Sequence, residues 1–221
     1  MSDLLVIVPS RGRPENVRAL RQAWRDTQTA ADLIVGLDDD DPRWLDYCGP
    51  VTVRSRMRLN AYTNALATEN AGQYRFLGSM GDDHRPRTAG WDRLICEALA
   101  EMGTGIVYGD DRLQGEALPT ACFMTSDIVQ MLGYMAPPCL EHMYIDNFWR
   151  DFGRAIGRLR YLPEVVIEHM HPVTGKSTTD QTYADADAVL PADGAAYQRY
   201  LTNGFDADVA KVRALCSSGT S

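Results

Sequence analysis

Two adjacent acidic residues follow an apolar stretch near the middle of the chain. The run at 74–77 predicts a strand, and Gly81 lets the backbone turn tightly before Asp82, Asp83 and His84. Two neighbouring carboxylates repel each other unless a cation neutralises them, and oxygen ligands suit Mg²⁺ or Mn²⁺. Such an ion can bridge a diphosphate and stabilise it as a leaving group. The alternative is a solvated acidic turn, because aspartate is common in turns.

A pair of histidines closes the last predicted strand, at 161–168. His169 and His171 are two of the four histidines in the chain. Alternation along an extended chain points both side chains to the same side, so either can complete a metal site that Asp83 begins. A single histidine is more often a packed or surface residue, but two at one strand end favour a binding role.

A basic loop joins the first predicted strand, at 4–8, to a helix that begins at Pro14. Backbone N–H groups and the helix dipole at such a start favour an anion. Arg11 and Arg13 add positive charge suited to phosphate. The loop has neither the dinucleotide-binding nor the phosphate-loop glycine pattern. For Arg13, an ordinary basic loop is a competing interpretation.

Asp146 lies in an acidic stretch rich in aromatic residues, 141–149, where a predicted helix at 146–156 begins. A carboxylate in apolar surroundings has a raised pKa and can serve as a general base. The alternative is a helix N-cap, which aspartate often supplies. The two roles are compatible.

Arginines recur within 54–58 and at Arg85 and Arg87. They can line a rim that holds a polyanionic acceptor, and Trp91 can stack on an acceptor ring. The alternatives are a solvated charged face for the arginines and a core position for Trp91, because the aromatic residues recur at helical spacing.

Strand and helix signals alternate through the first half of the chain, which predicts an α/β fold with a largely parallel sheet. Three predicted strands run into aspartate pairs, at 38–39, 82–83 and 110–111. Ligands bind at the carboxyl ends of the strands in such sheets. Apolar runs predict strands at 4–8, 33–37, 51–53, 74–77, 105–108, 120–125 and 161–168, and helices are predicted from Pro14, Leu59 and Trp91, after a Ser126 cap, and at 146–156 and 206–215.

Bulk composition sets limits on the class of protein. The 221 residues include 22 basic and 30 acidic ones, and the net charge of −8 disfavours a general nucleic-acid coat. Five scattered cysteines without a CxxC pair favour free thiols in a reducing compartment. No apolar run approaches the ~20 residues of a membrane span. We therefore expect a cytoplasmic protein.

In this order, the motifs resemble those of GT-A glycosyltransferases grouped with family 2, of the kind encoded by bacteriophages. The resemblance covers residues 3–175. It implies a Rossmann-like GT-A fold with a mixed, mostly parallel sheet flanked by helices. We expect this domain to span 1–175, and 176–221 to form a tail or helix that packs on or near the active site. From that tail, Lys176 and Asp180 can reach the donor if it folds back.

The resemblance also assigns roles to residues. His84 stands where the D-x-D motif of the family has its second aspartate, so Asp83 is the preferred metal ligand and Asp82 a ribose contact or co-ligand. Asp146 takes the place of the base, and the His-x-His triplet resembles an additional metal ligand. The nucleotide-sugar contacts that the resemblance implies are Pro9, Ser10, Arg11, Asp38, Asp39 and Asp82.

The implied reaction moves a sugar from a nucleotide-sugar, by family habit a UDP-sugar, to a hydroxyl with Mn²⁺ or Mg²⁺. Asp146 as base implies inversion, and a base too far from the anomeric carbon implies retention. The acceptor we expect is a 5-hydroxymethylated pyrimidine in phage DNA, contacted by Arg85, Arg87 and Trp91, within the host cytoplasm. The alternatives are a virion protein as acceptor, a sugar nucleotidyltransferase, or a non-catalytic nucleotide-sugar-binding protein. The oligomeric state stays open.

Overall fold

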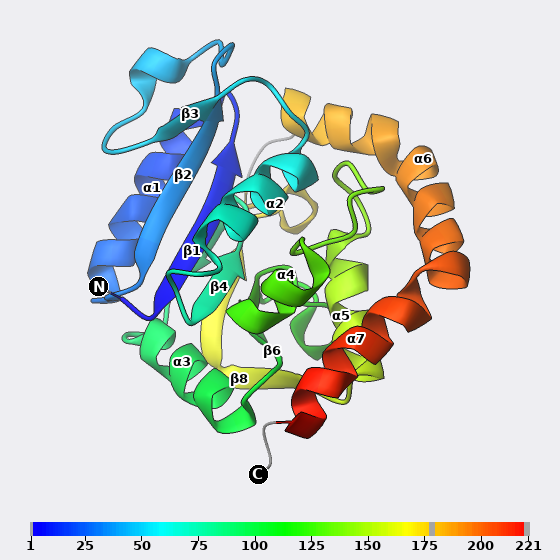
Figure 1. The fold of residues 1–221 in the computed structure, drawn as a ribbon. Helices are drawn as coiled ribbons and strands as arrows, with labels where there is room; N and C mark the ends of the chain where they lie inside the picture. The colour runs from blue at the N-terminus through cyan, green and yellow to red at the C-terminus, as the bar shows by residue number, and fades with distance from the viewer. Residues whose placement is uncertain (1, 177–179, 219–221) are drawn as a thin grey trace.

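A computed structural model describes residues 2–176 and 180–218 of the chain. Within these residues, strands and helices alternate over the first half of the sequence, as the apolar runs predict (Figure 1). The strands are β1 (Leu4–Ser10), β2 (Asp32–Asp38), β3 (Thr52–Arg54), β4 (Phe76–Ser79), β5 (His84–Pro86), β6 (Ile106–Asp110), β7 (Cys122–Thr125) and β8 (Leu159–His169).

The eight described strands form one sheet in the order β3-β2-β1-β4-β7-β6-β8-β5. The four strands from β3 to β4 are parallel, and β6 and β8 are also parallel to each other. β7 is antiparallel to both of its neighbours, and β5 is antiparallel to β8. The predicted mixed, mostly parallel sheet is therefore confirmed.

Seven described helices cover the two faces of this sheet. Figure 1 shows α6 and α7 on the side of the molecule away from α1. The helices are α1 (Pro14–Asp26), α2 (Leu59–Asn70), α3 (Trp91–Met102), α4 (Ser126–Leu132), α5 (Ile145–Ala155), α6 (Gln181–Asn203) and α7 (Phe205–Ser218).

The continuous apolar run of β1 is buried on both faces, as expected for an interior parallel strand. Leu4 and Val6 face one core, where they join Leu20 of α1 and Leu99 of α3. The alternate residues of β1 face a second core, built with α2, α4, α5, α6 and α7. The sheet is thus the middle of three layers, and its strand ends stay open for a site.

Two elements were not predicted. β5 forms from residues expected in a loop, because they pair with the end of β8 and place His84 opposite His169. α6 spans Gln181–Asn203 and has Pro191 in its interior. Its alanines favour a helix, but its apolar periodicity is weak, and contacts such as that of buried Tyr197 with the second core hold it in place.

The prediction that Ser126 caps α4 was wrong. The N-cap residue is Thr125, and Ser126 is the first residue of the helix. The Ser126 hydroxyl instead donates a 2.6 Å hydrogen bond to the carbonyl oxygen of Tyr74. A serine beside a helix start has this choice of backbone partners.

Candidate active site

Polar side chains from separate segments meet at the carboxyl end of the sheet. β1 ends at Ser10 and β2 at Asp38, and the turn after β4 carries Asp82 and Asp83. β8 ends at His169, whose backbone N–H donates to the carbonyl oxygen of Asp111 after β6. Parallel strands end at one edge, so residues far apart in sequence share this site.

Asp83 lies between two histidines. Its Oδ1 is 3.3 Å from His84 Nδ1, and its Oδ2 is 3.5 Å from His169 Nε2. The two imidazole rings stack with centroids 4.2 Å apart. Burial alone would raise the pKa of Asp83, but the hydrogen bonds with His169 and His84 hold it well below its usual value.

These three side chains form a set that fits a divalent cation. One ligand atom from each of Asp83, His84 and His169 lies within 4.8 Å of the others. His169 Nδ1 is buried without a hydrogen-bond partner among the described residues. Since Mg²⁺ prefers oxygen ligands and two of the three candidate ligands are imidazole nitrogens, this set fits a divalent transition-metal ion better than Mg²⁺.

Of the two histidines left open by the sequence, His169 lies beside Asp83. The Nδ1 of His171 accepts a 3.2 Å hydrogen bond from the backbone N–H of Val173, and its ring packs edge-on against His169 and Tyr183. His171 is therefore outside the three-residue group. His84 belongs to it, although the sequence treats His84 only as a departure from D-x-D. Its register opposite His169 comes from β5, which the sequence did not reveal.

Asp82 faces away from this group toward the β1–α1 loop. Its carboxylate accepts hydrogen bonds from Ser10 Oγ at 2.6 Å, Asn16 Nδ2 at 3.2 Å and Arg13 Nη1 at 3.3 Å. Burial raises the pKa of Asp82 to about 6, against the opposing charge of Arg13. Asp82 thus ties the turn after β4 to the loop after β1.

The predicted nucleotide contacts on β1 and β2 lie together. Arg11 pairs with Asp38 at 3.1 Å and with Asp40 at 2.5 Å, and Pro9 is in register with Gly36 of β2. Asp38 is buried, and its Oδ1 accepts a 3.2 Å hydrogen bond from the backbone N–H of Met57. The side chain of Asp39, by contrast, is exposed.

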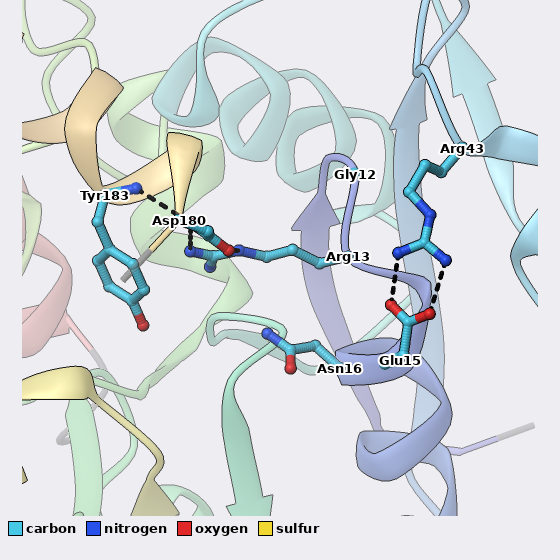
Figure 2. Close-up of a pocket in the computed structure, with 7 residues that line it drawn as sticks. All are labelled: Gly12, Arg13, Glu15, Asn16, Arg43, Asp180 and Tyr183. Carbon is cyan, nitrogen blue, oxygen red and sulfur yellow. Dashed lines mark hydrogen bonds and ion pairs between the residues drawn. The ribbon is translucent and has the colours of Figure 1, made fainter. Parts of the chain in front are cut away.

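The start of α6 closes over this loop. Figure 2 shows Arg13 reaching from the β1–α1 loop to Asp180, with Tyr183 beside them. Arg13 Nε donates to Asp180 at 2.6 Å, and its guanidinium lies 4.5 Å from the centre of the Tyr183 ring. The Tyr183 hydroxyl donates a 2.6 Å hydrogen bond to Asp83 Oδ2. A residue a hundred positions away in sequence thus contacts the central carboxylate.

A polar cavity of about 280 Å³ lies next to these contacts. On its far side Arg43 and Glu15 form two hydrogen bonds of 2.6 and 2.8 Å (Figure 2). Neither Tyr183 nor Arg43 was predicted to be near the site, since each lies outside the strand ends. The cavity is lined by Gly12, Arg13, Glu15, Asn16, Arg43, Asp180 and Tyr183.

Asp146 is the second residue of α5 and is not its N-cap, which is Tyr144. Burial raises the pKa of the Asp146 carboxyl, opposed by backbone N–H groups including that of Asn147 and by the charge of His169. Asp146 Oδ1 accepts a 3.0 Å hydrogen bond from Asn147. A raised pKa is the direction that a general base requires.

The third aspartate pair has a structural task. Asp111 Oδ1 accepts backbone hydrogen bonds of 2.7–2.9 Å from residues 113–115, and Thr120 donates to Oδ2 at 2.7 Å. Thr120 Oγ1 lies 3.4 Å from His84 Nε2. Asp111 therefore holds the loop after β6 in shape, and through Thr120 it is linked to His84.

Of the three residues predicted to contact the acceptor, two are buried and one is half exposed. Trp91 is fully buried in the core beneath α3, edge-on to Trp24 at 5.2 Å, so the prediction that it stacks on an acceptor was wrong. Arg85 is also buried, and its Nη1 donates at 2.7 Å to the carbonyl oxygens of Asp82 and His84. A guanidinium used in this way holds the turn and leaves no face for an acceptor. Arg87 is half exposed and pairs with Glu168.

The sequence of the chain matches no family model and no curated protein. Among solved structures, a mannosyltransferase from Pyrobaculum calidifontis in complex with GDP-Man and Mn²⁺ is similar over 99% of this chain and 81% of that chain, with 13% identity and a TM-score of 0.56. S. aureus TarS 1–349 in complex with UDP-GlcNAc is similar over 76% of this chain, with 11% identity and a TM-score of 0.56.

A third similar structure is that of CMP:2-keto-3-deoxy-manno-octonic acid synthetase complexed with CTP. It covers 79% of this chain and 96% of that chain, with 9% identity and a TM-score of 0.52. The chain spans 57% of the TarS 1–349 fragment and 36% of a longer TarS chain. At such low identity these likenesses establish the fold, a GT-A-like fold shared by sugar transferases and nucleotidyltransferases. Among the described residues, no helix is long and apolar enough to cross a bilayer.

Proposed function

We propose that this protein is a metal-dependent glycosyltransferase that moves a sugar from a nucleotide-sugar to a hydroxyl group. One observation carries the proposal. On a GT-A-like fold, the Asp83–His84–His169 group lies at the same sheet edge as the loops that end β1 and β2. A cation beside an anion-binding loop is the arrangement that a nucleoside diphosphate leaving group requires.

In this proposal Asp83, His84 and His169 hold Mn²⁺, with Mg²⁺ the weaker fit. The ion supplies positive charge that stabilises the departing diphosphate. Ser10, Arg11 and Arg13 bind the nucleotide end of the donor at the β1–α1 loop, with Asp38 behind Arg11. We propose a UDP-sugar as the donor.

Asp146 is the proposed general base. It accepts the proton of the acceptor hydroxyl as the hydroxyl oxygen bonds to the anomeric carbon, and the bond from that carbon to the diphosphate breaks. The products are the glycosylated acceptor, a nucleoside diphosphate and a proton on Asp146. Attack opposite the leaving group inverts the anomeric centre. The raised pKa of the buried Asp146 carboxyl supports this role.

The acceptor we propose is a 5-hydroxymethylated pyrimidine in DNA, and a phage origin and action in the host cytoplasm belong to the same proposal. Exposed arginines support DNA as the acceptor, because Arg56, Arg58 and Arg87 are each about half exposed. Such side chains can contact phosphates. In a duplex the target base would have to leave the stack to reach the sugar. A hydroxyl on a virion protein is the alternative acceptor.

The deciding experiment incubates the purified protein and Mn²⁺ with a panel of nucleotide-sugars and with hydroxymethylated DNA or virion protein. Released nucleoside diphosphate and a mass gain of one sugar on the acceptor are the expected results. Pyrophosphate released from a nucleoside triphosphate and a sugar phosphate would instead identify a nucleotidyltransferase. Donor binding without turnover on any acceptor would identify a binding protein and reject the proposal.

A further inference from the structure

A buried carboxylate in the middle of α6 is bonded to the loop that precedes α5. The side chain of Asp193 is 1% exposed. Its Oδ1 accepts a 2.9 Å hydrogen bond from the backbone N–H of Glu141. Its Oδ2 accepts hydrogen bonds from the backbone N–H groups of His142 at 2.9 Å and of Met143 at 2.7 Å. One carboxylate thus binds three successive amides.

This arrangement fixes the loop firmly. A buried carboxylate is costly unless it is hydrogen-bonded, and charge-assisted bonds to backbone amides are among the stronger ones in proteins. Tyr144 follows with φ +65°, a left-handed conformation that is uncommon outside glycine. The loop therefore takes a path that local preferences do not favour, and an outside group must impose it.

The rest of that face of α6 fits the same loop. A Cβ on Gly194 would lie 3.1 Å from the Tyr144 hydroxyl, so the absence of a side chain there permits the close approach. The rings of Tyr144 and Tyr197 stack with centroids 5.7 Å apart. Asp193, Gly194 and Tyr197 together form a seat for residues 141–144.

The loop leads directly into α5, the helix that carries the proposed base. Asp146 follows Tyr144 by two residues and lies in the first turn of α5. A shift of this loop would therefore move the start of α5 and with it the proposed base.

We propose that Asp193 is a positioning residue for sugar transfer: it holds residues 141–144 and thereby the start of α5, so that Asp146 keeps the place that the general base requires. The inference rests on the proposed function, in which Asp146 is the base. It gives a role in catalysis to α6, a helix that lies outside the catalytic domain expected from the sequence. A merely structural Asp193 would stabilise the protein without affecting the transfer step.

The test compares Asp193→Asn with Asp208→Asn. Both residues are buried aspartates of the C-terminal helices. Asp208 of α7 accepts hydrogen bonds from Tyr134 and Tyr200 and forms an ion pair with Lys211. None of these three partners belongs to the 141–144 loop. Asparagine keeps the size of the side chain but places an N–H₂ group against backbone N–H donors.

For Asp193→Asn we expect kcat to fall by roughly 10- to 100-fold, because a displacement of about 1 Å is enough for such a loss. The KM for the nucleotide-sugar should stay within about threefold, since the donor loops are untouched. Asp208→Asn, measured per folded molecule, should keep kcat within about twofold, because it lowers stability without moving the base. Equal kcat values for the two variants would overturn the inference.

Backbone hydrogen exchange gives a second readout that does not need activity. The amides of residues 141–143 should exchange faster in Asp193→Asn and unchanged in Asp208→Asn. Unchanged exchange in both would overturn the anchoring, and faster exchange with normal kcat would overturn the positioning role. If the wild-type protein transfers no sugar while amide exchange at residues 141–143 still differs between the two variants as expected, the proposed function and the positioning role of Asp193 both fail. The conclusion that Asp193 anchors the 141–144 loop would stand.

Discussion

At the scale of single residues, the site depends on Asp83. Its carboxylate meets His84, His169 and Tyr183, which come from different parts of the chain. Such a carboxylate is either the centre of a metal site or a purely structural hub. The two roles differ in whether a cation binds, and direct measurement of binding separates them.

Asp83→Ala should weaken Mn²⁺ binding by at least about 10-fold, because even indirect supports of metal ligands are worth that much. Titration calorimetry or the spin resonance of free Mn²⁺ measures the change. Asp3→Ala is the matched control, since Asp3 pairs with Arg75 just before β1 begins, at the opposite end of the strand from the site. Equal Mn²⁺ affinity in the two variants would contradict the metal site.

Asp146→Asn should lower kcat by about 100-fold or more, because general-base catalysis contributes about that factor. The nucleotide-sugar should still bind with unchanged affinity, since Asp146 is not among the donor contacts. Steady-state kinetics measures the fall in kcat, and calorimetry measures the affinity for the nucleotide-sugar. Glu97→Gln on the exposed face of α3 serves as the control. Retained turnover in Asp146→Asn would reject the base assignment.

At the scale of elements, the notable feature is how α6 and α7 join the rest. The first turn of α6 contacts Arg13 and Asp83, its middle holds the loop before α5, and α7 packs with the second core. The division at 175 stays a prediction from the sequence. Two of these contacts, the hydrogen bond from Tyr183 of α6 to Asp83 and those made by Asp208 of α7, lead to testable predictions.

Tyr183→Phe should strengthen Mn²⁺ binding by about 2- to 10-fold. The Tyr183 hydroxyl donates to Asp83 Oδ2, and a ligand oxygen freed from a hydrogen bond worth about 0.5–1.5 kcal/mol binds a cation more readily. Tyr74→Phe is the matched control, because Tyr74 makes a similar 3.0 Å bond to Asp32 at the start of β2. Weaker Mn²⁺ binding in Tyr183→Phe would mean that the phenol helps to hold the ion.

Asp208→Asn should lower the free energy of unfolding by about 1–3 kcal/mol at pH 7. Burial opposes ionisation of Asp208, but hydrogen bonds from Lys211, Tyr134 and Tyr200 outweigh it and hold the pKa below its usual value. The stabilisation is therefore present above the pKa of an unfolded aspartate, about 4, and is lost as the pH falls through the folded pKa. Urea unfolding at pH 7 and at pH 3 measures the difference, which should shrink in acid. A loss of unfolding free energy in Asp208→Asn that is the same at pH 7 and at pH 3 would contradict the charge-based explanation.

At the scale of the whole molecule, a net charge of −8 opposes binding to a polyanion, so any contact with DNA must come from local arginines. Binding to hydroxymethylated DNA should therefore weaken steeply as salt rises. Arg87→Ala should reduce the slope of log K against log salt by about 1, the effect of one phosphate contact. Arg93→Ala, an exposed arginine of α3, is the control. Binding without salt dependence would count against DNA and favour the virion protein.

The sequence alone was enough to predict the order of the elements through β8, apart from β5, together with the largely parallel sheet and the strand ends where polar residues gather. These features follow from local signals: apolar runs specify buried strands, and the aspartate pairs stand at the end of such a run at 38–39 and in the turn after one at 82–83. The resemblance to GT-A glycosyltransferases gave the fold correctly because it rests on the order of these motifs. The raised pKa of Asp146 also agrees in direction with its apolar neighbourhood.

Which side chains meet could be seen only in the folded chain. His84 joined Asp83 and His169 because β5 pairs with β8, and a three-residue strand carries no periodic signal. Trp91 and Arg85 proved to be buried, since burial depends on what packs above a residue. From α6, Tyr183 contacts Asp83 and Asp193 holds the loop before α5, and such long-range contacts arise only when the chain has folded. Sequence spacing constrains near neighbours, whereas long-range packing brings together groups that share no local pattern.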